Sequence, residues 1–416
     1  MGLTSHLRRA TLDVRALRSS PAFRRLFTAQ LLSQIGSEIT LVTLIVQVYR
    51  LTHSTLAVGM IGAAAVIPTL VFALAGGAIA DAVDRKKLLV GIQVGMMGVS
   101  ATLAVLAQGS PPVWTLYALA ALLSTFAAVD GPTRTAVIPS LVAPDELRSA
   151  IQLREVLTQG GRMIGPVMGG LLITTFGLST AYAVDAATFA IAFALFLGLP
   201  KLIPETRRRF EVGAIIEAFT FVGARPVLAA TFIADLFAMV LGQQRALFPA
   251  YALHVFHSSD ASVGYLIAAP ATGAVVGLLF AGLTERVRRE GLAVLVSVSV
   301  WGLAIAAFSQ TSTLWVAIAV LAIAGWADMI SAIFRQTILL ETVPDELRGR
   351  MSAVHIMVVT GGPRAGDFQA GAMAELVGIR TASLVGGLGC VAGMGLLAWR
   401  NPQFRRWTRP DAPTPA

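Results

Sequence analysis

One face of a predicted helix over residues 148–175 carries ionisable and amide side chains into an apolar segment. At about 100° per residue, the members of this stripe are Arg148, Gln152, Glu155, Gln159 and Arg162, and Pro166 continues it. A charged side chain at the centre of a bilayer costs about 2.5 to 3.5 kcal/mol on insertion scales, so it is expected to face a wet interior. The stripe therefore predicts one wall of a polar cavity inside a membrane protein.

Glycines form a second stripe on the same predicted helix. Gly161, Gly165 and Gly169 recur at every fourth position, and Gly170 follows the last of them. Small residues at this spacing let the backbone of a neighbouring helix approach closely. Spacing alone fits a packing helix of any multi-span membrane protein as well as a functional helix, so the surrounding fold has to decide.

Further ionisable residues occur within apolar runs. Glu38 lies near the middle of a predicted helix over residues 26–49, with Gln34 on the same side. Intramembrane carboxylates are functional candidates by default, and the alternative is a buried glutamate that is neutral or paired for stability alone. We interpret Glu38, and in second place Asp235 or Asp328, as a proton carrier. The expected cavity residues are Gln34, Glu38, Gln159, Arg162, Asp185, Arg245 and Arg364.

The composition restricts the class of protein. Of the 416 residues, 56% are hydrophobic and 13% are charged, whereas about a quarter of residues are charged in soluble domains. The formal net charge of +9 comes mostly from arginines between apolar runs, so the expected partner is anionic membrane lipid and not nucleic acid. Cys390 is the only cysteine, and no ATP-binding phosphate loop occurs. We expect no metal site and no cofactor, because His254 and His257 lack a third ligand.

Apolar runs predict twelve membrane-spanning helices, which agrees with the chain length at about 20 residues a span. Their ranges are 26–49, 55–80, 88–107, 113–137, 148–175, 178–199, 226–253, 263–283, 292–308, 314–339, 352–377 and 381–399. Arginine and lysine gather in the tails and in alternate loops, which places both termini in the cytoplasm. The predicted organisation is a cytoplasmic segment 1–25, a six-helix bundle 26–199, a central cytoplasmic loop 200–225, a second six-helix bundle 226–399 and a cytoplasmic tail 400–416.

Several sequence features occur once in each half. Pro-Asp-Glu-Leu-Arg stands at 144–148 and again at 344–348, and His-Ser stands at 53–54 and at 257–258. Asp81 and Arg85 in the first half correspond to Glu285 and Arg289 in the second. Glycines 161, 165 and 170 likewise correspond to glycines 362, 366 and 371. A single shared motif is explained by a common device for starting helices, but four features in similar order indicate a duplicated six-helix unit.

Two motifs and this twofold plan resemble the major facilitator superfamily. The pattern Gly161-x-x-x-Gly165-Pro166-x-x-Gly169-Gly170 is similar to the antiporter motif in its fifth transmembrane helix, which is associated with exporters. Gly77, Asp81, Arg85 and Lys86 are similar to its loop 2-3 motif, although Ala82 and Asp84 depart from that pattern. The run 21–55, and Pro249 with Gly325-Trp326, resemble the enterobactin exporter subgroup and its multidrug relatives.

The resemblance implies an all-α membrane protein of the cell inner membrane and not an enzyme. It implies a monomeric, proton-coupled exporter that moves a small amphiphilic drug or siderophore by alternating access. Asp81, Arg85 and Lys86 are then expected to latch the two halves on the cytoplasmic side. Siderophore-type anions and lipophilic cations remain alternatives as cargo. An importer or lipid transporter of the same fold, and a receptor or scaffold that transports nothing, remain alternative functions.

Overall fold

The computed structural model describes residues 13–204, 217, 220–279, 282, 284 and 287–409, and these residues form helices and connections with no strand among them. Residues 1–12, most of the central loop 200–225, Glu285 and the tail from residue 410 lie outside the described residues. The N-terminal half contains α2 (Arg15–Ser19), α3 (Pro21–Thr52), α4 (Thr55–Ala82), α5 (Arg85–Leu106), α6 (Val113–Val137) and α7 (Leu147–Leu197). The C-terminal half contains α9 (Pro226–Leu241), α10 (Phe248–Ala250), α11 (Ala261–Leu279), α12 (Glu290–Gln310), α13 (Leu314–Thr342), α14 (Asp345–Val377), α15 (Ile379–Arg400) and α16 (Pro402–Arg405).

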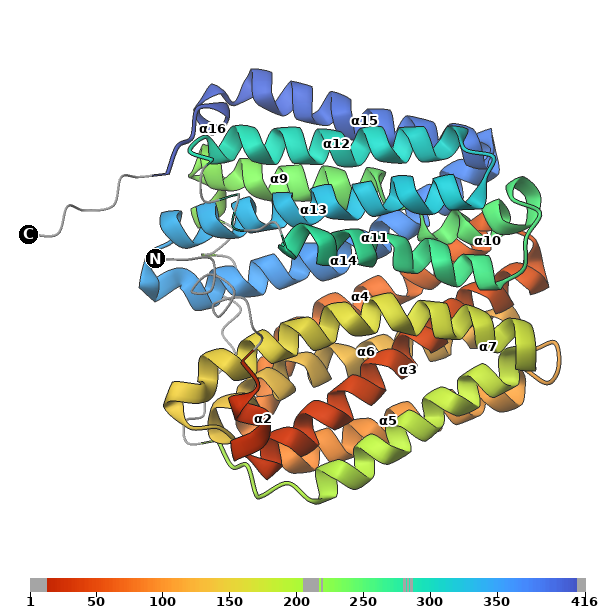
Figure 1. Cartoon of the computed structure of the whole chain (residues 1–416), viewed down its shortest axis with the longest axis vertical. Coiled ribbons are helices and arrows are strands. Elements are labelled where there is room, and N and C mark those ends of the chain that lie inside the picture. Colours follow the sequence, from red (N-terminus) through yellow and green to blue (C-terminus); the bar gives the residue numbers. More distant parts are fainter. Residues whose placement is uncertain are drawn as a thin grey trace, which may run out of the picture.

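The two halves lie side by side as bundles of long helices, and α2 and α16 lie at the same end of the molecule (Figure 1). We call this the terminal end and the opposite end the distal end. Two helix pairs join the halves, α4 with α14 and α7 with α11. Any side chain between these pairs therefore belongs to the contact surface of the two bundles.

The described part holds ten helical segments that are long and apolar enough to cross a membrane. One of them includes all of α7, which bends at Gly177 and so comprises two spans. The 33-residue α14 is less apolar, but it packs between α4 and α9 over its length. With these two additions the layout agrees with the twelve spans expected from the sequence.

Backbone conformation repeats between the halves. Among the described residues, the positive φ angles occur at His53 and His257 (50° and 46°) and at Gly177 and Gly378 (84° and 85°). The histidines follow the first span of each half, and the glycines separate the fifth span from the sixth. A φ near +85° is unfavourable for residues with a Cβ atom, so both half-repeats need glycine at this turn.

The seventh span is interrupted, although the sequence predicts a continuous helix over 226–253. α9 ends at Leu241, and the chain continues through a 3₁₀ turn at Arg245–Leu247, α10 and a π-helical turn at Tyr251–Val255. Gly242 caps the C-terminal end of α9, and Pro249 stands in the first turn of α10, where its missing N–H group costs no helical hydrogen bond. The interruption places Arg245 inside the bundle on irregular backbone.

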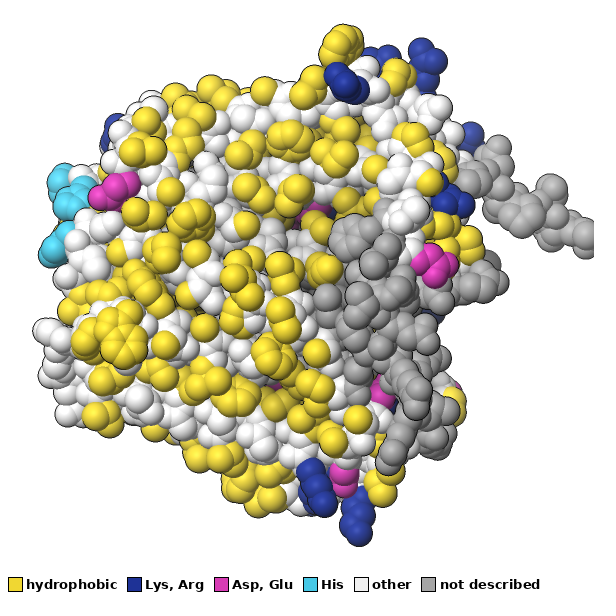
Figure 2. Space-filling model, turned by 180° about the vertical axis from the view of Figure 1, so that it is seen from behind, with side chains coloured by type: hydrophobic (Ala, Val, Ile, Leu, Met, Phe, Trp, Pro, Cys, Tyr) yellow, Lys and Arg dark blue, Asp and Glu magenta, His cyan; other side chains and the backbone are white. Residues whose placement is uncertain are grey.

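The molecular surface has the character of a membrane-spanning protein. Hydrophobic side chains cover most of the face in Figure 2, while lysine and arginine side chains gather on the part of that face nearer the terminal end. Trp114 and Trp315, at the distal starts of α6 and α13, are each 70% exposed, and Trp399 near the terminal end is 73% exposed. Tryptophan is enriched at membrane interfaces, so these residues mark the two edges of the apolar belt.

Candidate functional site

Polar contacts join the two halves at the distal end. Arg50 forms an ion pair with Asp260, and the hydroxyl of Tyr49 lies 2.9 Å from Nε2 of His254. Ser54 donates a hydrogen bond of 3.0 Å to Glu375. The hydrogen bonds and ion pairs found between described residues of the two halves all lie at this end. In this conformation the distal end is closed.

Close helix packing reinforces the closed end. A methyl group at Gly170 of α7 would lie 2.8 Å from the carbonyl oxygen of Ala261 on α11. A methyl group at Gly59 of α4 would lie 2.7 Å from the carbonyl oxygen of Asp367 on α14. These distances leave no room for a side chain, so the glycines set how near the two bundles come.

The glycine stripe of α7 packs against α3 next to Glu38. A methyl group at Gly165 would lie 2.6 Å from Cβ of Glu38, and one at Gly161 would lie 2.5 Å from Cγ of Gln34. Gln34 donates a hydrogen bond of 3.1 Å to Oε1 of Glu38, and both side chains are half-buried. The stripe thus serves helix packing, as its spacing predicts, and its partner is the helix that carries Glu38.

A three-residue charge cluster lies in the C-terminal half. Arg335 of α13 pairs with Asp235 of α9 at 2.8 Å and with Asp328 of α13 at 3.7 Å. Arg335 and Asp235 are buried, and the side chain of Asp328 is 33% exposed. Arg162, which is exposed on α7, lies close enough to interact electrostatically with Asp328 across the two halves. This brings Arg162, Asp235 and Asp328 together from three helices.

A second charged group surrounds the interrupted seventh span. Arg245 pairs with Asp367 of α14 at 3.4 Å. One turn before Asp367, the Arg364 guanidinium donates a hydrogen bond of 2.8 Å to the carbonyl oxygen of Thr360. Two guanidinium groups, those of Arg245 and Arg364, thus lie near the single carboxylate of Asp367, close to the surface where α14 meets α4.

The remaining residues assigned to the cavity by sequence are buried. Asp185 is 0% exposed between α3, α5 and the second part of α7, and its carboxylate accepts hydrogen bonds from Thr40 and Ser100. Gln159 on the polar stripe of α7 is 9% exposed. Asp185 thus lies within the N-terminal half, on the opposite face of α3 from Glu38.

Sequence reasoning gave no site role to two of the paired residues. Arg335 follows Asp328 by seven positions, so the sequence places both on one helical face, but this spacing does not show that Asp235 of α9 meets that face. Asp367 lies in a segment rich in glycine and charge, and nothing in the spacing connects it to Arg245.

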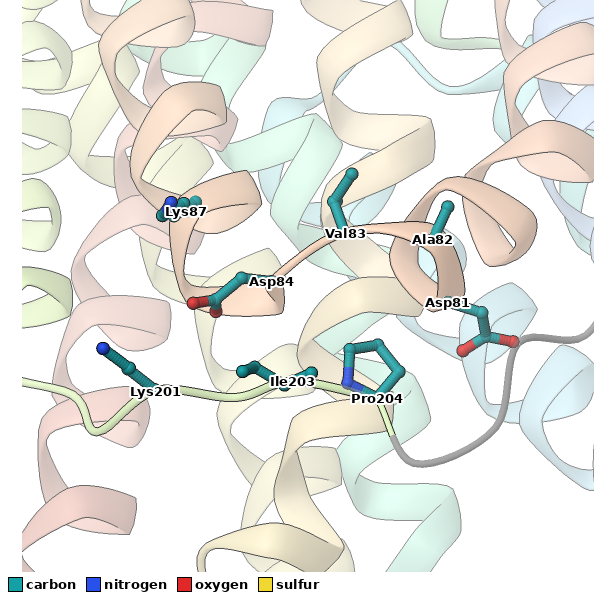
Figure 3. Close-up of a pocket in the computed structure, with 8 residues that line it drawn as sticks. All are labelled: Asp81, Ala82, Val83, Asp84, Lys87, Lys201, Ile203 and Pro204. Carbon is teal, nitrogen blue, oxygen red and sulfur yellow. The ribbon is translucent and has the colours of Figure 1, made fainter.

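The loop 2-3 motif forms a self-contained corner at the turn from α4 to α5 (Figure 3). Arg85 pairs with Asp81 at 2.9 Å and donates to the carbonyl oxygen of Ala136, while Lys86 donates to the carbonyl oxygen of Leu199. A methyl group at Gly77 would meet no atom within 4 Å. A pocket of about 360 Å³ beside the turn is lined by Asp81, Ala82, Val83, Asp84, Lys87, Lys201, Ile203 and Pro204. All these contacts stay within the N-terminal half.

Within the part of the chain that the structure describes, no group of three or more His, Cys, Asp or Glu side chains could hold a metal ion. The polar groups described between the helices are instead one or two carboxylates with arginine, amide or hydroxyl partners. Such groups can bind a proton or an ionised organic molecule.

Two bundles of membrane-spanning helices, joined by α4 with α14 and α7 with α11 and enclosing ionisable residues, define a transporter of the major facilitator superfamily. Residues 15–411 match the family described as "Transmembrane secretion effector", and the chain belongs to this family. It is a multi-pass membrane protein of the exporter type that moves small molecules, and it is not an enzyme.

Known relatives agree with this assignment. The chain is similar to the enterobactin exporter EntS of Citrobacter koseri, with 28% identity over 404 residues and 96% of each chain covered. Its fold is similar to that of the nucleoside transporter NupG, with a TM-score of 0.74 and 14% identity, covering 91% of this chain and 98% of that one. A bacterial homologue of the lysosomal transporter Spinster, solved in an inward-facing and unoccupied conformation, gives a TM-score of 0.70 with 16% identity, covering 94% of this chain and 100% of that one.

Proposed function

We propose that the protein exports a small amphiphilic molecule in exchange for protons by alternating access, with Glu38 as the coupling carboxyl group. One observation carries this proposal. Glu38 lies half-buried on α3 against the glycine stripe of α7, and its hydrogen-bond partner Gln34 is neutral. No described arginine or lysine forms an ion pair with Glu38, so among these residues no ion pair has to break when its charge changes. The change in charge then acts on the α3–α7 contact itself.

The orientation in the membrane is part of the proposal. Basic residues gather at the terminal end, which supports a cytoplasmic location of both termini. The distal end, which is closed by Arg50, Asp260 and Glu375, then faces outward. Asp235 and Asp328 are second candidates for proton coupling, but both share Arg335, so protonation of either one competes with an ion pair.

Siderophore-type anions are the cargo class that we favour. The EntS relatives export enterobactin, as their names state. In this chain Arg162 is exposed on the face of α7 that interacts with Asp328. Arg245 pairs with Asp367, and Arg364 is a second guanidinium group close enough to interact electrostatically with that carboxylate. This local excess of guanidinium groups supports an anionic cargo over a lipophilic cation. Enterobactin is therefore the first probe to use, and ethidium is the cationic comparison.

The test uses inside-out membrane vesicles with the full-length chain and an acidic interior. We expect gradient-driven uptake of labelled enterobactin in the wild-type protein and its loss in Glu38→Gln, because glutamine cannot carry a proton. Asp145→Asn is the control, since it removes an exposed carboxylate from the 3₁₀ turn before α7. Unchanged gradient-driven uptake in a normally expressed Glu38→Gln protein would reject the role of Glu38. Uptake of ethidium and not of enterobactin would reverse the assignment of cargo.

A further inference from the structure

Asp185 is a carboxyl group enclosed by hydroxyl groups inside the N-terminal half. Thr40 of α3 donates a hydrogen bond of 2.6 Å to Oδ2 of Asp185, and Ser100 of α5 donates one of 2.7 Å to the same atom. Thr188, one turn later on α7, lies 3.4 Å from Oδ1. Gly36 of α3 faces the carboxyl group, and a methyl group there would collide with it. The pocket is therefore fitted closely to a carboxyl group.

Five other aspartates of the long helices, which are buried or half-buried, have a different environment. Each of the following lies in an ion pair with an arginine: Asp81, Asp130, Asp235, Asp328 and Asp367. No described residue forms an ion pair with Asp185, which is 0% exposed. The free energy needed to bury an ionised carboxylate is far larger than the free energy gained from two hydroxyl hydrogen bonds, so buried groups of this kind become neutral. The surroundings of Asp185 thus favour the protonated acid.

The distances at the carboxyl group show direct contact between Oδ2 and the two hydroxyl groups, with no metal ion between them. Separations of 2.6 and 2.7 Å between Oδ2 and the two hydroxyl oxygens are those of direct O–H···O hydrogen bonds. Oxygens that share a metal ion, at about 2.0–2.6 Å from each, lie further apart from one another than this. The pocket in this conformation has the geometry of a directly hydrogen-bonded carboxyl group, and its burial without a cationic partner among the described residues is what favours the protonated form.

We infer that Asp185 is a second proton-binding site of this exporter, formed by α3, α5 and α7 and separate from Glu38. The only other titratable group of the described residues that faces it is the buried phenol of Tyr182, which donates to Gln47 at 2.8 Å. Thr40 and Glu38 lie on opposite faces of α3, so a movement of this helix changes both sites together. The role of Asp185 in transport rests on the proposed proton coupling, whereas its protonation does not.

Protonation is tested first, by infrared spectroscopy of the full chain in lipid at neutral pH. We expect the wild-type protein to show the carbonyl stretch of a protonated acid that is missing in Asp185→Asn. Asparagine keeps the size of the group and its ability to accept hydrogen bonds. Thr40→Val should shift this band, because it removes one hydroxyl partner. A wild-type spectrum without such a band, or a band that appears only after sodium is removed, would overturn the inference.

Coupling is tested second, with labelled enterobactin in the inside-out vesicles. We expect Asp185→Asn to retain exchange of enterobactin without a gradient and to lose stimulation by the pH gradient. Ser309→Ala is the control, since it removes a buried hydroxyl of the C-terminal half that bonds only to its own helix. Full stimulation in Asp185→Asn would show the acid to be structural and would overturn its role in coupling. If the wild-type protein fails to move the probe, the proposed function fails, while the infrared result still decides whether Asp185 is protonated.

Discussion

Replacement of Arg335 by methionine should destabilise the protein strongly, because it leaves a buried carboxylate without its cation. The Arg335 and Asp235 side chains are 9% and 4% exposed and lie 2.8 Å apart. Removing one partner of a buried pair costs about 3–5 kcal/mol. We expect the free energy of unfolding to fall by this amount in Arg335→Met. Methionine retains much of the apolar packing, so the loss comes mainly from the charge.

The second carboxylate of the cluster should matter much less for stability. Asp328 lies 3.7 Å from Arg335, and its side chain is 33% exposed. Partly exposed pairs contribute about 0–1 kcal/mol, so Asp328→Asn should stay within that range. The structure thus predicts that Arg335→Met lowers the free energy of unfolding far more than Asp328→Asn does.

A double-mutant cycle measures the pair directly. Unfolding by sodium dodecyl sulfate in mixed micelles, followed by tryptophan fluorescence, gives the stability of each variant. We expect Asp235→Asn combined with Arg335→Met to be more stable than Arg335→Met alone, because the uncompensated charge is gone. Arg400→Met, at an exposed position, is the control and should change stability by less than about 0.5 kcal/mol. Additive losses in the double variant would refute the assignment of a coupled buried pair.

Two further predictions concern the closed distal end. Gly264→Ala should open the distal end, because the new methyl group would collide with the carbonyl oxygen of Pro166. Amide hydrogen exchange in the connections of that end should then rise. Gly160→Ala adds a methyl group that meets no atom within 4 Å, so it should leave this exchange unchanged. Equal exchange in both alanine variants would contradict the packing role of Gly264. Asp260→Asn should raise the same exchange by no more than about fivefold, since its pair with Arg50 is partly exposed, and the effect should shrink in high salt. A much larger rise, or one that salt does not reduce, would mean that this ion pair alone holds the end closed.

The sequence was sufficient for the fold because the fold depends on patterns along the chain. Apolar runs of about 20 residues define spans, and motifs repeated between the halves define the duplication. The backbone turns at Gly177 and Gly378 agree with that duplication. The interruption at Arg245–Leu247 was not predicted, although the polar run 242–245 and Pro249 break the apolar pattern there.

The site was predicted less completely, for a physical reason. Helical periodicity tells which face a side chain occupies, but it says nothing about which neighbouring helix meets that face. The pairing of Arg335 with Asp235 and the packing of Gly165 against Glu38 both depend on the arrangement of separate helices. For the same reason, the placement of Asp185 in the cavity was an expectation from its charge, whereas the structure surrounds it with hydroxyl groups.

The division of contacts within and between the halves bears on how such a protein could change conformation. The ion pairs Arg335–Asp235 and Arg134–Asp130 each lie within one half, so the halves can rotate as units without breaking them. The polar contacts between the halves are a partly exposed ion pair and hydroxyl hydrogen bonds, each of which contributes about 0–1.5 kcal/mol. A ligand must favour one conformation by about 5.5 kcal/mol to move an equilibrium from 1:99 to 99:1. The polar contacts at the distal end therefore contribute only a small part of the free energy that opposes opening, an amount that one proton and one bound cargo molecule can offset.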